Sequence, residues 1–237
     1  MNVFDVLGPV MIGPSSSHTA GAAKIVRLAG MILGEKAVQA DISLHGSFAA
    51  TYHGHGTDRA LVGGLLGLGA DDERLRDALQ LAVREGLAVT FHRENLGDVH
   101  PNTAKICARG VSGRTVELVA SSTGGGDIRV INLSGFSVDF DGSSYTLIVP
   151  HQDRAGTVAA VTAVLAEESV NIAQMKVARE LVGADAMMII ETDQECDQIG
   201  LEKIRRRCPK SSPLCEKLKK RAVILITRTC MIIFIVN

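Results

Sequence analysis

Apolar and polar residues alternate in several short segments of the first 140 positions. Because successive side chains of a strand point to opposite faces, this period of two predicts half-buried strands in an antiparallel or mixed sheet. The segments with this pattern are 38–44, 87–91, 104–108 and 136–140. Residues 22–32 and 75–82 instead repeat their apolar positions every three or four residues, which predicts helices with one buried face. This part of the chain is therefore predicted to be α+β, an α/β sandwich domain rather than a regular βαβ array.

The pattern restarts after the turn-rich residues Asp141–Ser144, which predict a domain boundary. The elements that follow are strand, helix, strand, strand and helix, at 145–149, 157–167, 171–179, 184–192 and 200–207. This is the order of a ferredoxin-like unit that lacks its last strand. The predicted domains are therefore 1–142 and 145–207, followed by a tail at 208–237.

The tail is basic in its first half and apolar in its second half. Residues 222–236 are apolar except for Thr227, Arg228 and Thr229. A membrane-spanning helix needs about 20 apolar residues, so this run is too short to cross a bilayer. Two strands that are separated at Thr227–Thr229 are the expected structure.

The composition is that of an ordinary soluble globular protein, with 46% hydrophobic residues, 22% charged residues and a net charge of -1. Lys and Arg are scattered ahead of the tail, so the chain has no basic stripe for a nucleic acid. The first residues lack a basic segment and carry Asp5, which argues against a secretory signal and favours a cytoplasmic location. Neither a nucleic acid nor a membrane is an expected partner.

The five cysteines are odd in number and contain no C-x-x-C pair. They favour neither a disulfide framework nor a zinc site, and reduced structural thiols are the simpler interpretation. A [4Fe-4S] cluster requires closely grouped thiolates. The sequence therefore predicts no metal ligands in this chain.

The run GPSSSHTAG, residues 13–21, stands directly before the helical pattern that starts at Ala22. Its hydroxyls, the His18 imidazole and unpaired backbone N–H groups would surround one point at a helix N-terminus, where the helix dipole favours an anion such as a carboxylate. The simpler alternative is a serine-rich N-cap with His18 on the surface. The spacing matches neither of the glycine-rich phosphate-loop motifs.

Histidines dominate a second cluster, HGSF at 45–48 followed by YHGHGTD at 52–58. On an extended segment His53 and His55 would point the same way, and their glycine neighbours would let a ligand approach the backbone. Two imidazoles can move a proton, but they make no metal site without a third ligand. A hydrogen-bonded structural role for one of them is the alternative. Asp58 is expected to orient one imidazole or to cap the helix that begins at Arg59.

Two further clusters lie near predicted strand ends. In VHPNTAK, residues 99–105, the proline fixes a bend, and Asn102, Thr103 and Lys105 offer donors to a small anion. The alternative is that Asn102 and Thr103 only complete the turn. In SSTGGGD, residues 121–127, three glycines stand between two strands, where a flexible hairpin is favoured over a ligand-facing backbone.

Four motifs, in this order and spacing, resemble the β chain of bacterial iron-sulfur L-serine dehydratases. They are GPVMIGPSSSHTAGAAKI, HGSFAATYHGHGTDRALVGGLLG, VHPNTAKI and STGGGDI. The later segment LIVPHQDRAGTVAAVTAVLAEESVNIAQMKVARE resembles an ACT domain, in which the loop with Asp153 and Gly156 often holds an amino-acid ligand. The resemblance covers residues 3–203 and ends before the tail, whose sequence departs from the family.

The resemblance implies that L-serine loses water and then ammonia to give pyruvate, without pyridoxal phosphate. It also implies a partner, the α chain, which supplies the [4Fe-4S] cluster in a heterodimer or a larger assembly. Together with the clustering described above, it implies roles for residues of this chain. His18 and His55 would be the catalytic imidazoles, and the substrate would be bound by Ser15, Ser16, Ser17, Thr19, Asn102 and Thr103.

Two other functions stay open at this point. A chain with an ACT domain can bind serine or another amino acid as a regulatory subunit, without catalysis. A self-contained hydrolase that uses Ser17 and His18 is disfavoured, because adjacent residues seldom present a productive nucleophile and base to each other. The sequence also lacks a G-x-S-x-G elbow.

Overall fold

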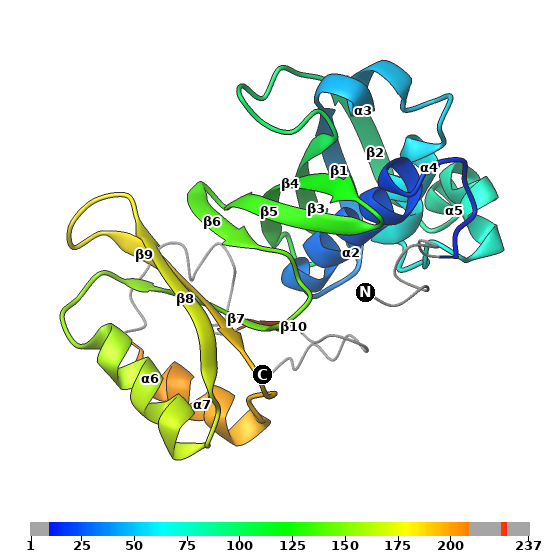
Figure 1. Cartoon of the computed structure of the whole chain (residues 1–237). Coiled ribbons are helices and arrows are strands. Elements are labelled where there is room, and N and C mark those ends of the chain that lie inside the picture. The colour runs from blue at the N-terminus through cyan, green and yellow to red at the C-terminus, as the bar shows by residue number, and fades with distance from the viewer. Residues whose placement is uncertain (1–9, 209–223, 227–237) are drawn as a thin grey trace. The chain divides into compact units, whose positions relative to one another are not determined.

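The computed structural model describes residues 10–208 and 224–226 of the chain (Figure 1). The chain divides into two compact units, Met1–Ser134 and Gly135–Asn237. This division lies just ahead of strand β6 (Phe136–Phe140), whereas the boundary predicted at Asp141–Ser144 lies just after it. Within the described ranges, no helix is long and apolar enough to cross a membrane.

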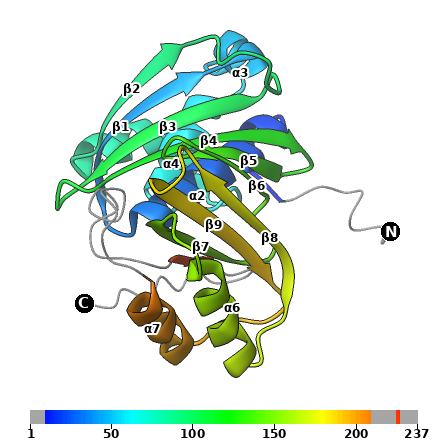
Figure 2. The same ribbon diagram turned by 90° about the vertical axis from the view of Figure 1, so that its left-hand side faces the viewer.

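The first unit consists of helices packed on a mixed sheet (Figure 2). Its helical elements are η1 (Ser17–Gly21), α2 (Ala22–Leu33), α3 (Gly46–Thr51), α4 (Thr57–Leu65), η2 (Glu73–Asp77) and α5 (Ala78–Arg84). Its strands are β1 (Ala37–Leu44), β2 (Ala88–Arg93), β3 (Thr103–Gly110), β4 (Thr115–Gly124) and β5 (Asp127–Leu133). Within this unit the strands are neighbours in the order β2-β1-β3-β4-β5. β1 is parallel to β2 and antiparallel to β3, so the sheet is mixed, which is one of the two predicted forms.

The core of the first unit lies between helix α2 and the sheet. Ile25, Leu28 and Ile32 share one face of α2, and all three are buried. The helix packs against β3 and β4, where Ile106 and Leu118 are also fully buried. Each such side chain contributes about 1.5–3 kcal/mol through the removal of its apolar surface from water. This packing fixes α2, and therefore also the turn η1 that leads into it.

Most of the elements predicted for this part are confirmed. The alternating segments are the strands β1, β2, β3 and β6, and the three glycines after Thr123 form the predicted hairpin between β4 and β5. The helix predicted over 75–82 is interrupted, because Leu75 lies in the 3₁₀ turn η2 and α5 begins only at Ala78. Leu79, one of the apolar positions that define the predicted buried face of 75–82, is exposed, since a 3₁₀ turn changes the angle between successive residues.

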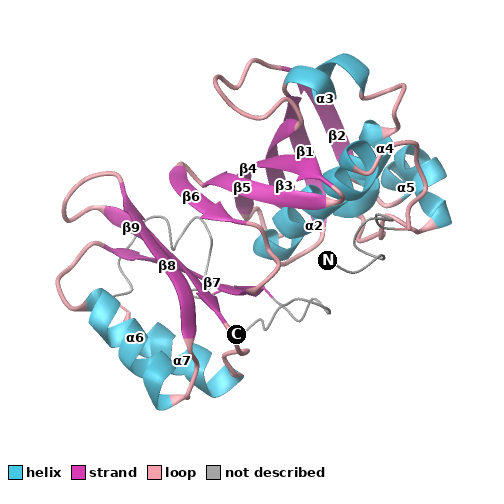
Figure 3. Cartoon of the chain, in the orientation of Figure 1, coloured by secondary structure: helices cyan, strands magenta, loops and turns pink. Residues whose placement is uncertain are grey.

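The second unit contains a four-stranded sheet with two helices on one face (Figure 3). Its elements are β7 (Tyr145–Gln152), α6 (Thr157–Glu167), β8 (Ile172–Arg179), β9 (Asp185–Thr192), α7 (Gln198–Arg207) and β10 (Ile224–Ile226). The strand order is β10-β7-β9-β8, and every neighbouring pair is antiparallel. Leu147 and Met188 of the sheet share one buried cluster with Val164 of α6 and Ile204 of α7. The strands and helices predicted between residues 145 and 207 are all present.

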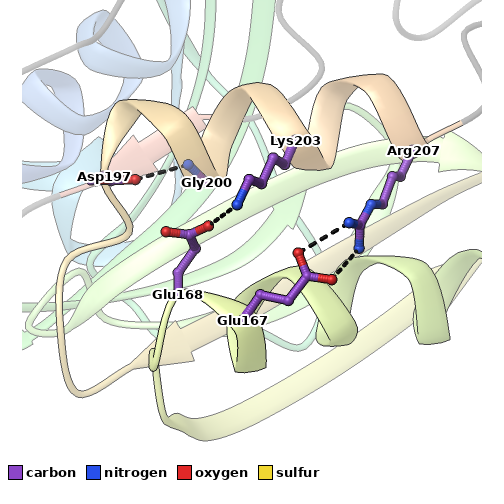
Figure 4. Close-up of polar contacts among 6 residues, drawn as sticks. All are labelled: Glu167, Glu168, Asp197, Gly200, Lys203 and Arg207. Carbon is purple, nitrogen blue, oxygen red and sulfur yellow. Dashed lines mark hydrogen bonds and ion pairs between the residues drawn. The ribbon is translucent and has the colours of Figure 1, made fainter.

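Charged side chains connect α6 and α7 on their outer side (Figure 4). Glu168 accepts from Lys203 at 2.5 Å, and Glu167 accepts twice from the Arg207 guanidinium, at 2.8 and 3.0 Å. Asp197 caps α7 by accepting from the backbone N–H of Gly200 at 2.8 Å. Exposed ion pairs contribute only about 0–1 kcal/mol each, so the buried apolar cluster is the main stabilising contact between the two helices.

The tail contributes one short element to the described structure. Residues 224–226 form β10, which pairs with β7 at the edge of the sheet. The predicted ferredoxin-like unit lacked its last strand, and the three-residue strand β10 takes that place. The second strand predicted beyond Thr229 lies outside the described residues.

Candidate active site

The second half of the hydroxyl-rich run GPSSSHTAG forms a helical turn. Helix α2 begins at Ala22, as predicted, and residues 17–21 add the π-helical turn η1 directly ahead of it, which the sequence did not predict. The Gly21 N–H donates to the carbonyl of Ser16, five residues earlier, at 2.9 Å, which is the hydrogen bond of a π-helical turn. π-turns are rare and often occur at functional sites. The turn places His18 and Thr19 in the interior, with 7% and 1% of their surface exposed, which excludes the alternative of a surface histidine.

The His18 imidazole has hydroxyl groups at both of its nitrogens. Nδ1 lies 3.2 Å from Ser15 Oγ, which also accepts the backbone N–H of His18 at 3.4 Å. Nε2 lies 3.1 Å from Thr51 Oγ1 and 3.3 Å from Ser47 Oγ, both on α3. The ring is therefore fixed from two sides by elements that are far apart in the sequence.

Aromatic neighbours complete the environment of His18. The ring centroid lies 5.2 Å from that of Phe48 and 4.7 Å from that of His55, and the two imidazoles are nearly perpendicular, at 87°. Burial, and next the proximity of His55, lower the pKa of His18 below its ordinary value, although a hydrogen bond with the backbone of Ser47 opposes the shift. At neutral pH His18 is therefore an uncharged imidazole, which is the form that a general base requires.

Helix α3 is attached to the loop that precedes β3. The Phe48 N–H donates to the carbonyl of Pro101 at 3.4 Å, and the His45 N–H donates to the carbonyl of Thr103 at 3.0 Å. Gly46 has a positive φ of 54°, and a Cβ atom there would lie 2.7 Å from the Pro101 carbonyl oxygen. Only glycine fits this approach, so the sequence HGSF allows the two segments to come together.

The loop residues Asn102 and Thr103 have different surroundings. The Thr103 hydroxyl donates to the carbonyl of His100 at 2.6 Å and lies 2.7 Å from Ser121 Oγ of β4, so it is already engaged. The backbone carbonyl of Asn102 accepts from the Ser122 N–H at 2.9 Å. The side-chain Oδ1 of Asn102 is buried without a hydrogen-bond partner among the residues that the structure describes. Asn102 therefore has spare hydrogen-bonding capacity, whereas Thr103 has little.

Other buried polar atoms close to η1 also lack partners within the described chain. They are Thr19 Oγ1, His55 Nδ1, Thr57 Oγ1 and Ser122 Oγ. Ser122 lies directly against η1, since a Cβ atom at Gly21 would be 1.9 Å from its Oγ. Buried polar groups in proteins nearly always have partners, so such a group calls for a bound molecule or water. Unsatisfied polar atoms thus come from η1, α4, β4 and the loops that precede α4 and β3.

A cavity of about 410 Å³ opens beside His55. Its lining includes Pro14, Leu75, the two guanidinium-bearing residues Arg59 and Arg76, and the turn of residues 53–56, and it includes no carboxylate residue. Small-molecule sites typically have volumes of about 300–1,000 Å³. The cavity therefore has room for an amino acid, and its charge favours an anion.

The prediction that His53 and His55 point the same way was wrong. Residues 52–56 form turns instead of an extended strand, with the His55 N–H bonded to the carbonyl of Thr51 at 3.0 Å. His55 faces His18, whereas His53 Nδ1 lies 2.9 Å from the carboxylate of Asp58 and its side chain is 70% exposed. Asp58 thus orients one imidazole, that of His53, which was one of its two predicted roles. It lies inside the first turn of α4.

The chain was compared with known proteins. The family model described as serine dehydratase beta chain matches residues 2–77. The chain is 46% identical over 205 residues to the "Probable L-serine dehydratase, beta chain" of Bacillus subtilis (strain 168), covering 86% of this chain and 93% of that protein. It is 39% identical over 194 residues to the "L-serine dehydratase, beta chain" of Peptoniphilus asaccharolyticus, covering 81% of this chain and 87% of that protein. The chain belongs to the family of L-serine dehydratase beta chains. The resemblance inferred from the four motifs is confirmed.

Most of the residues predicted for the site in this beta chain lie in the first unit, around η1. Ser15 and His55 contact His18, and Thr19 is buried beside it. Ser16 occupies the N-cap position of η1, where its side chain makes no capping bond, and Ser17 is the first residue of that turn. The roles of these residues in binding or catalysis stay predictions.

The two residues predicted to hold an ACT ligand lie in the second unit. Asp153 accepts from the Arg179 guanidinium at 2.8 Å and from the Gly183 N–H at 3.1 Å. These partners hold the pKa of the Asp153 carboxyl below its usual value, the Gly183 backbone contributing most. Gly156 is the N-cap of α6, with a positive φ of 87°. Whether this loop binds a ligand stays a prediction.

Two contacts of His18, with Ser47 and Thr51, were not predicted from the sequence. Ser47 stood in the second cluster without an assigned role, and Thr51 was not singled out. Their spacing of four residues in HGSFAAT is the signal that was available, because residues i and i+4 share one face of a helix. The six-residue helix α3 was not predicted, so this face was not recognised.

The residues that the structure describes do not fit an iron-sulfur cluster. Among them, no three His, Cys, Asp or Glu side chains group as metal ligands. Burial raises the pKa of the Cys107 thiol, and it raises the pKa of Cys196 to about 11, so both favour the protonated form over the thiolate that iron requires. The source of the cluster ligands stays a prediction.

Proposed function

We propose that this chain is the beta subunit of a [4Fe-4S]-dependent L-serine dehydratase, which converts L-serine to pyruvate and ammonia without pyridoxal phosphate. The alpha subunit is the proposed partner and the proposed source of the cluster. The names of the two relatives, both beta chains of L-serine dehydratases, support serine as the substrate and a second chain as the partner. The observation that carries the proposal for this subunit is the buried, uncharged His18, which is held by hydroxyls and packs against His55, a residue that lines the cavity.

In this proposal the residues around η1 bind and deprotonate the amino acid. Ser15, Ser16, Ser17 and Thr19 hold the substrate carboxylate and ammonium. His18 takes the proton from the α-carbon, because an uncharged imidazole can accept one, and His55 acts as its acid or orienting partner. The unpartnered hydroxyl of Thr19 supports this assignment, since a substrate oxygen or nitrogen would satisfy it.

Asn102 and Thr103, at the loop before β3, have different roles in the proposal. Asn102 positions the substrate, which its unpartnered side-chain oxygen supports. Thr103 holds the loop itself, because its hydroxyl is engaged by His100 and Ser121. This assigns Thr103 a supporting role instead of the direct contact expected from the sequence.

We further propose that residues 145–207, completed by β10, form an ACT domain that binds an amino acid. The strand order β10-β7-β9-β8 and the two helices on one face support this, because they correspond to the order of a split βαββαβ unit. Asp153 and Gly156 lie at the loop between β7 and α6 where a ligand is expected. Calorimetry with free amino acids, repeated on Asp153→Asn, tests this part alone.

Anaerobic co-expression with an alpha chain, followed by a serine-to-pyruvate assay, tests the catalytic proposal. His18→Ala in the reconstituted complex is expected to abolish turnover. His92→Ala serves as a matched control, because His92 lies on β2 with half of its side chain exposed, and it should retain activity. A near-normal kcat/KM for His18→Ala would remove this residue from the mechanism.

The rival function is a regulatory subunit that binds an amino acid without catalysis. Its signature would be amino-acid binding by this chain alone, with no pyruvate formed when the alpha chain and ferrous iron are added. That outcome would overturn the catalytic proposal and leave the ACT proposal in place.

A further inference from the structure

The hydrogen atom of the Thr51 hydroxyl has a defined position. Thr51 Oγ1 donates to the backbone carbonyl of Ser47, one helical turn earlier, at 2.8 Å. A threonine hydroxyl has a single hydrogen to donate, although its oxygen can also accept. Towards His18 Nε2, 3.1 Å away, Thr51 can therefore only accept. This contact requires that the hydrogen between them belongs to Nε2.

The other nitrogen of His18 must then be unprotonated. A neutral imidazole carries a hydrogen on only one of its two nitrogens. If Nε2 carries it, Nδ1 is an acceptor, and the Ser15 hydroxyl at 3.2 Å is the group that donates to it. The same Ser15 oxygen accepts the backbone N–H of His18, so both of its bonds agree with this arrangement. The lowered pKa of His18, caused first by burial, supports the neutral state at physiological pH.

Ser47 adds a second acceptor at the protonated nitrogen. Its Oγ lies 3.3 Å from Nε2, slightly farther than Thr51 Oγ1. Ser47 thus contributes its backbone carbonyl to fix the Thr51 hydrogen and its hydroxyl to receive the His18 hydrogen. All these contacts come from α3, whose start is docked on the loop before β3.

We propose that Thr51, together with Ser47, is a positioning residue that holds His18 in the Nε2–H tautomer and directs its basic nitrogen, Nδ1, towards Ser15. The catalytic consequence rests on the proposed function. A proton that His18 accepts from the α-carbon then forms its new bond at Nδ1, on the serine-rich side of the ring, while the electron pair of the broken C–H bond stays on the substrate. Thr51 takes no part in the bond changes.

Nitrogen NMR of the full chain, with ¹⁵N-labelled histidine, tests the tautomer directly. The two ring nitrogens of neutral histidine differ strongly in chemical shift according to which one is protonated, and His18→Gln assigns the signals by their loss. In the wild-type chain His18 is expected to show a protonated Nε2. Thr51→Val, which removes the acceptor, is expected to shift the population towards Nδ1–H, and Thr51→Ser is expected to restore the wild-type pattern.

Thr162→Val is the matched control. Thr162 of α6 also donates to the carbonyl four residues earlier, that of Val158, at 3.1 Å, but it contacts no histidine in the described structure. Its replacement should leave the His18 signals unchanged. A wild-type His18 with a protonated Nδ1 would overturn the proposal, as would an unchanged tautomer in Thr51→Val. If Thr51→Val does not fold, the spectra of the wild-type chain and of Thr51→Ser still show which nitrogen of His18 is protonated.

Kinetics of the complex with the alpha chain provide the functional readout. Thr51→Val is expected to lower kcat/KM by about tenfold, the equivalent of losing one hydrogen bond of about 1.4 kcal/mol in the transition state, with recovery in Thr51→Ser. Full activity in Thr51→Val would show that the tautomer is not used in catalysis. The two proposals fail separately: a complex without any turnover refutes the proposed function, and the NMR result stands without it.

Discussion

Replacing Gly46 with alanine tests how tightly helix α3 is attached to the rest of the site. Gly46 stands at the start of α3 with a φ of 54°, in the left-handed region that alanine rarely adopts. A Cβ atom there would lie 2.7 Å from the carbonyl oxygen of Pro101 and 2.8 Å from its Cα. Both are backbone atoms, so neither can rotate away, and the helix or the loop must shift.

Two effects should lower the free energy of unfolding of Gly46→Ala. The left-handed backbone costs an alanine about 1–2 kcal/mol relative to glycine. The overlap with Pro101 adds about 1–3 kcal/mol, the usual range for overpacking in a close-packed region. The free energy of unfolding of Gly46→Ala should therefore fall by about 2–5 kcal/mol, a large share of the roughly 5–15 kcal/mol that stabilises a typical domain.

Gly86→Ala separates these two parts. Gly86 also has a positive φ, 72°, but a Cβ atom there would meet nothing within 4 Å. Urea unfolding of both variants should show Gly46→Ala to be the less stable one by the steric part, about 1–3 kcal/mol. Gly46→Ala should also reduce serine turnover in the complex, because α3 carries Ser47 and Thr51. Equal destabilisation by the two alanines would refute the close contact between α3 and Pro101.

Three other predictions concern stability. His151 is buried, and burial is the main cause that lowers its pKa, so the unfolded chain binds a proton at this residue more readily than the folded chain does. The free energy of unfolding should therefore fall as the pH drops below about 6.5. His151→Asn should remove part of this loss when unfolding is measured at about pH 7.5 and pH 5.5. Thr103→Val should cost about 1–3 kcal/mol in urea unfolding, because it leaves the buried Ser121 hydroxyl without its 2.7 Å partner; no loss would argue against this bond. Arg207→Gln should change stability little, since its pair with Glu167 is exposed, and a thermal shift typical of a core mutation would contradict this.

Regular elements were predictable from the sequence because their burial is periodic. β1 shows this: Ala40, Ile42 and Leu44 are fully buried, and they alternate with polar residues in the sequence. The same holds for the buried face of α2. Where the backbone departs from one regular period, the prediction failed, as at η2, where a 3₁₀ turn moves Leu79 to the surface.

The candidate residues could be chosen from the sequence, but their arrangement could not. The motif GPSSSHTAG marked His18 and Ser15 as candidates, because hydroxyls and an imidazole at a helix N-terminus can surround an anion. The orientation of His53 and His55 depended on the backbone between α3 and α4, which turns instead of extending. The hydroxyl of Thr51 reaches His18 from 33 positions away, a pairing that only the docking of α3 on another loop creates.

The π-helical turn at residues 17–21 holds one residue more than an α-helical turn would. Deleting one residue there would restore regular α-helix and rotate the preceding chain by about 100° around the axis, the angle of one residue in an α-helix. If the deleted residue follows His18, the His18 ring would rotate away from Ser47 and Thr51 of α3, while the buried stripe of α2 would stay in phase with the sheet. A one-residue change in length would thus separate His18 from its partners on α3 and leave the packing of α2 intact.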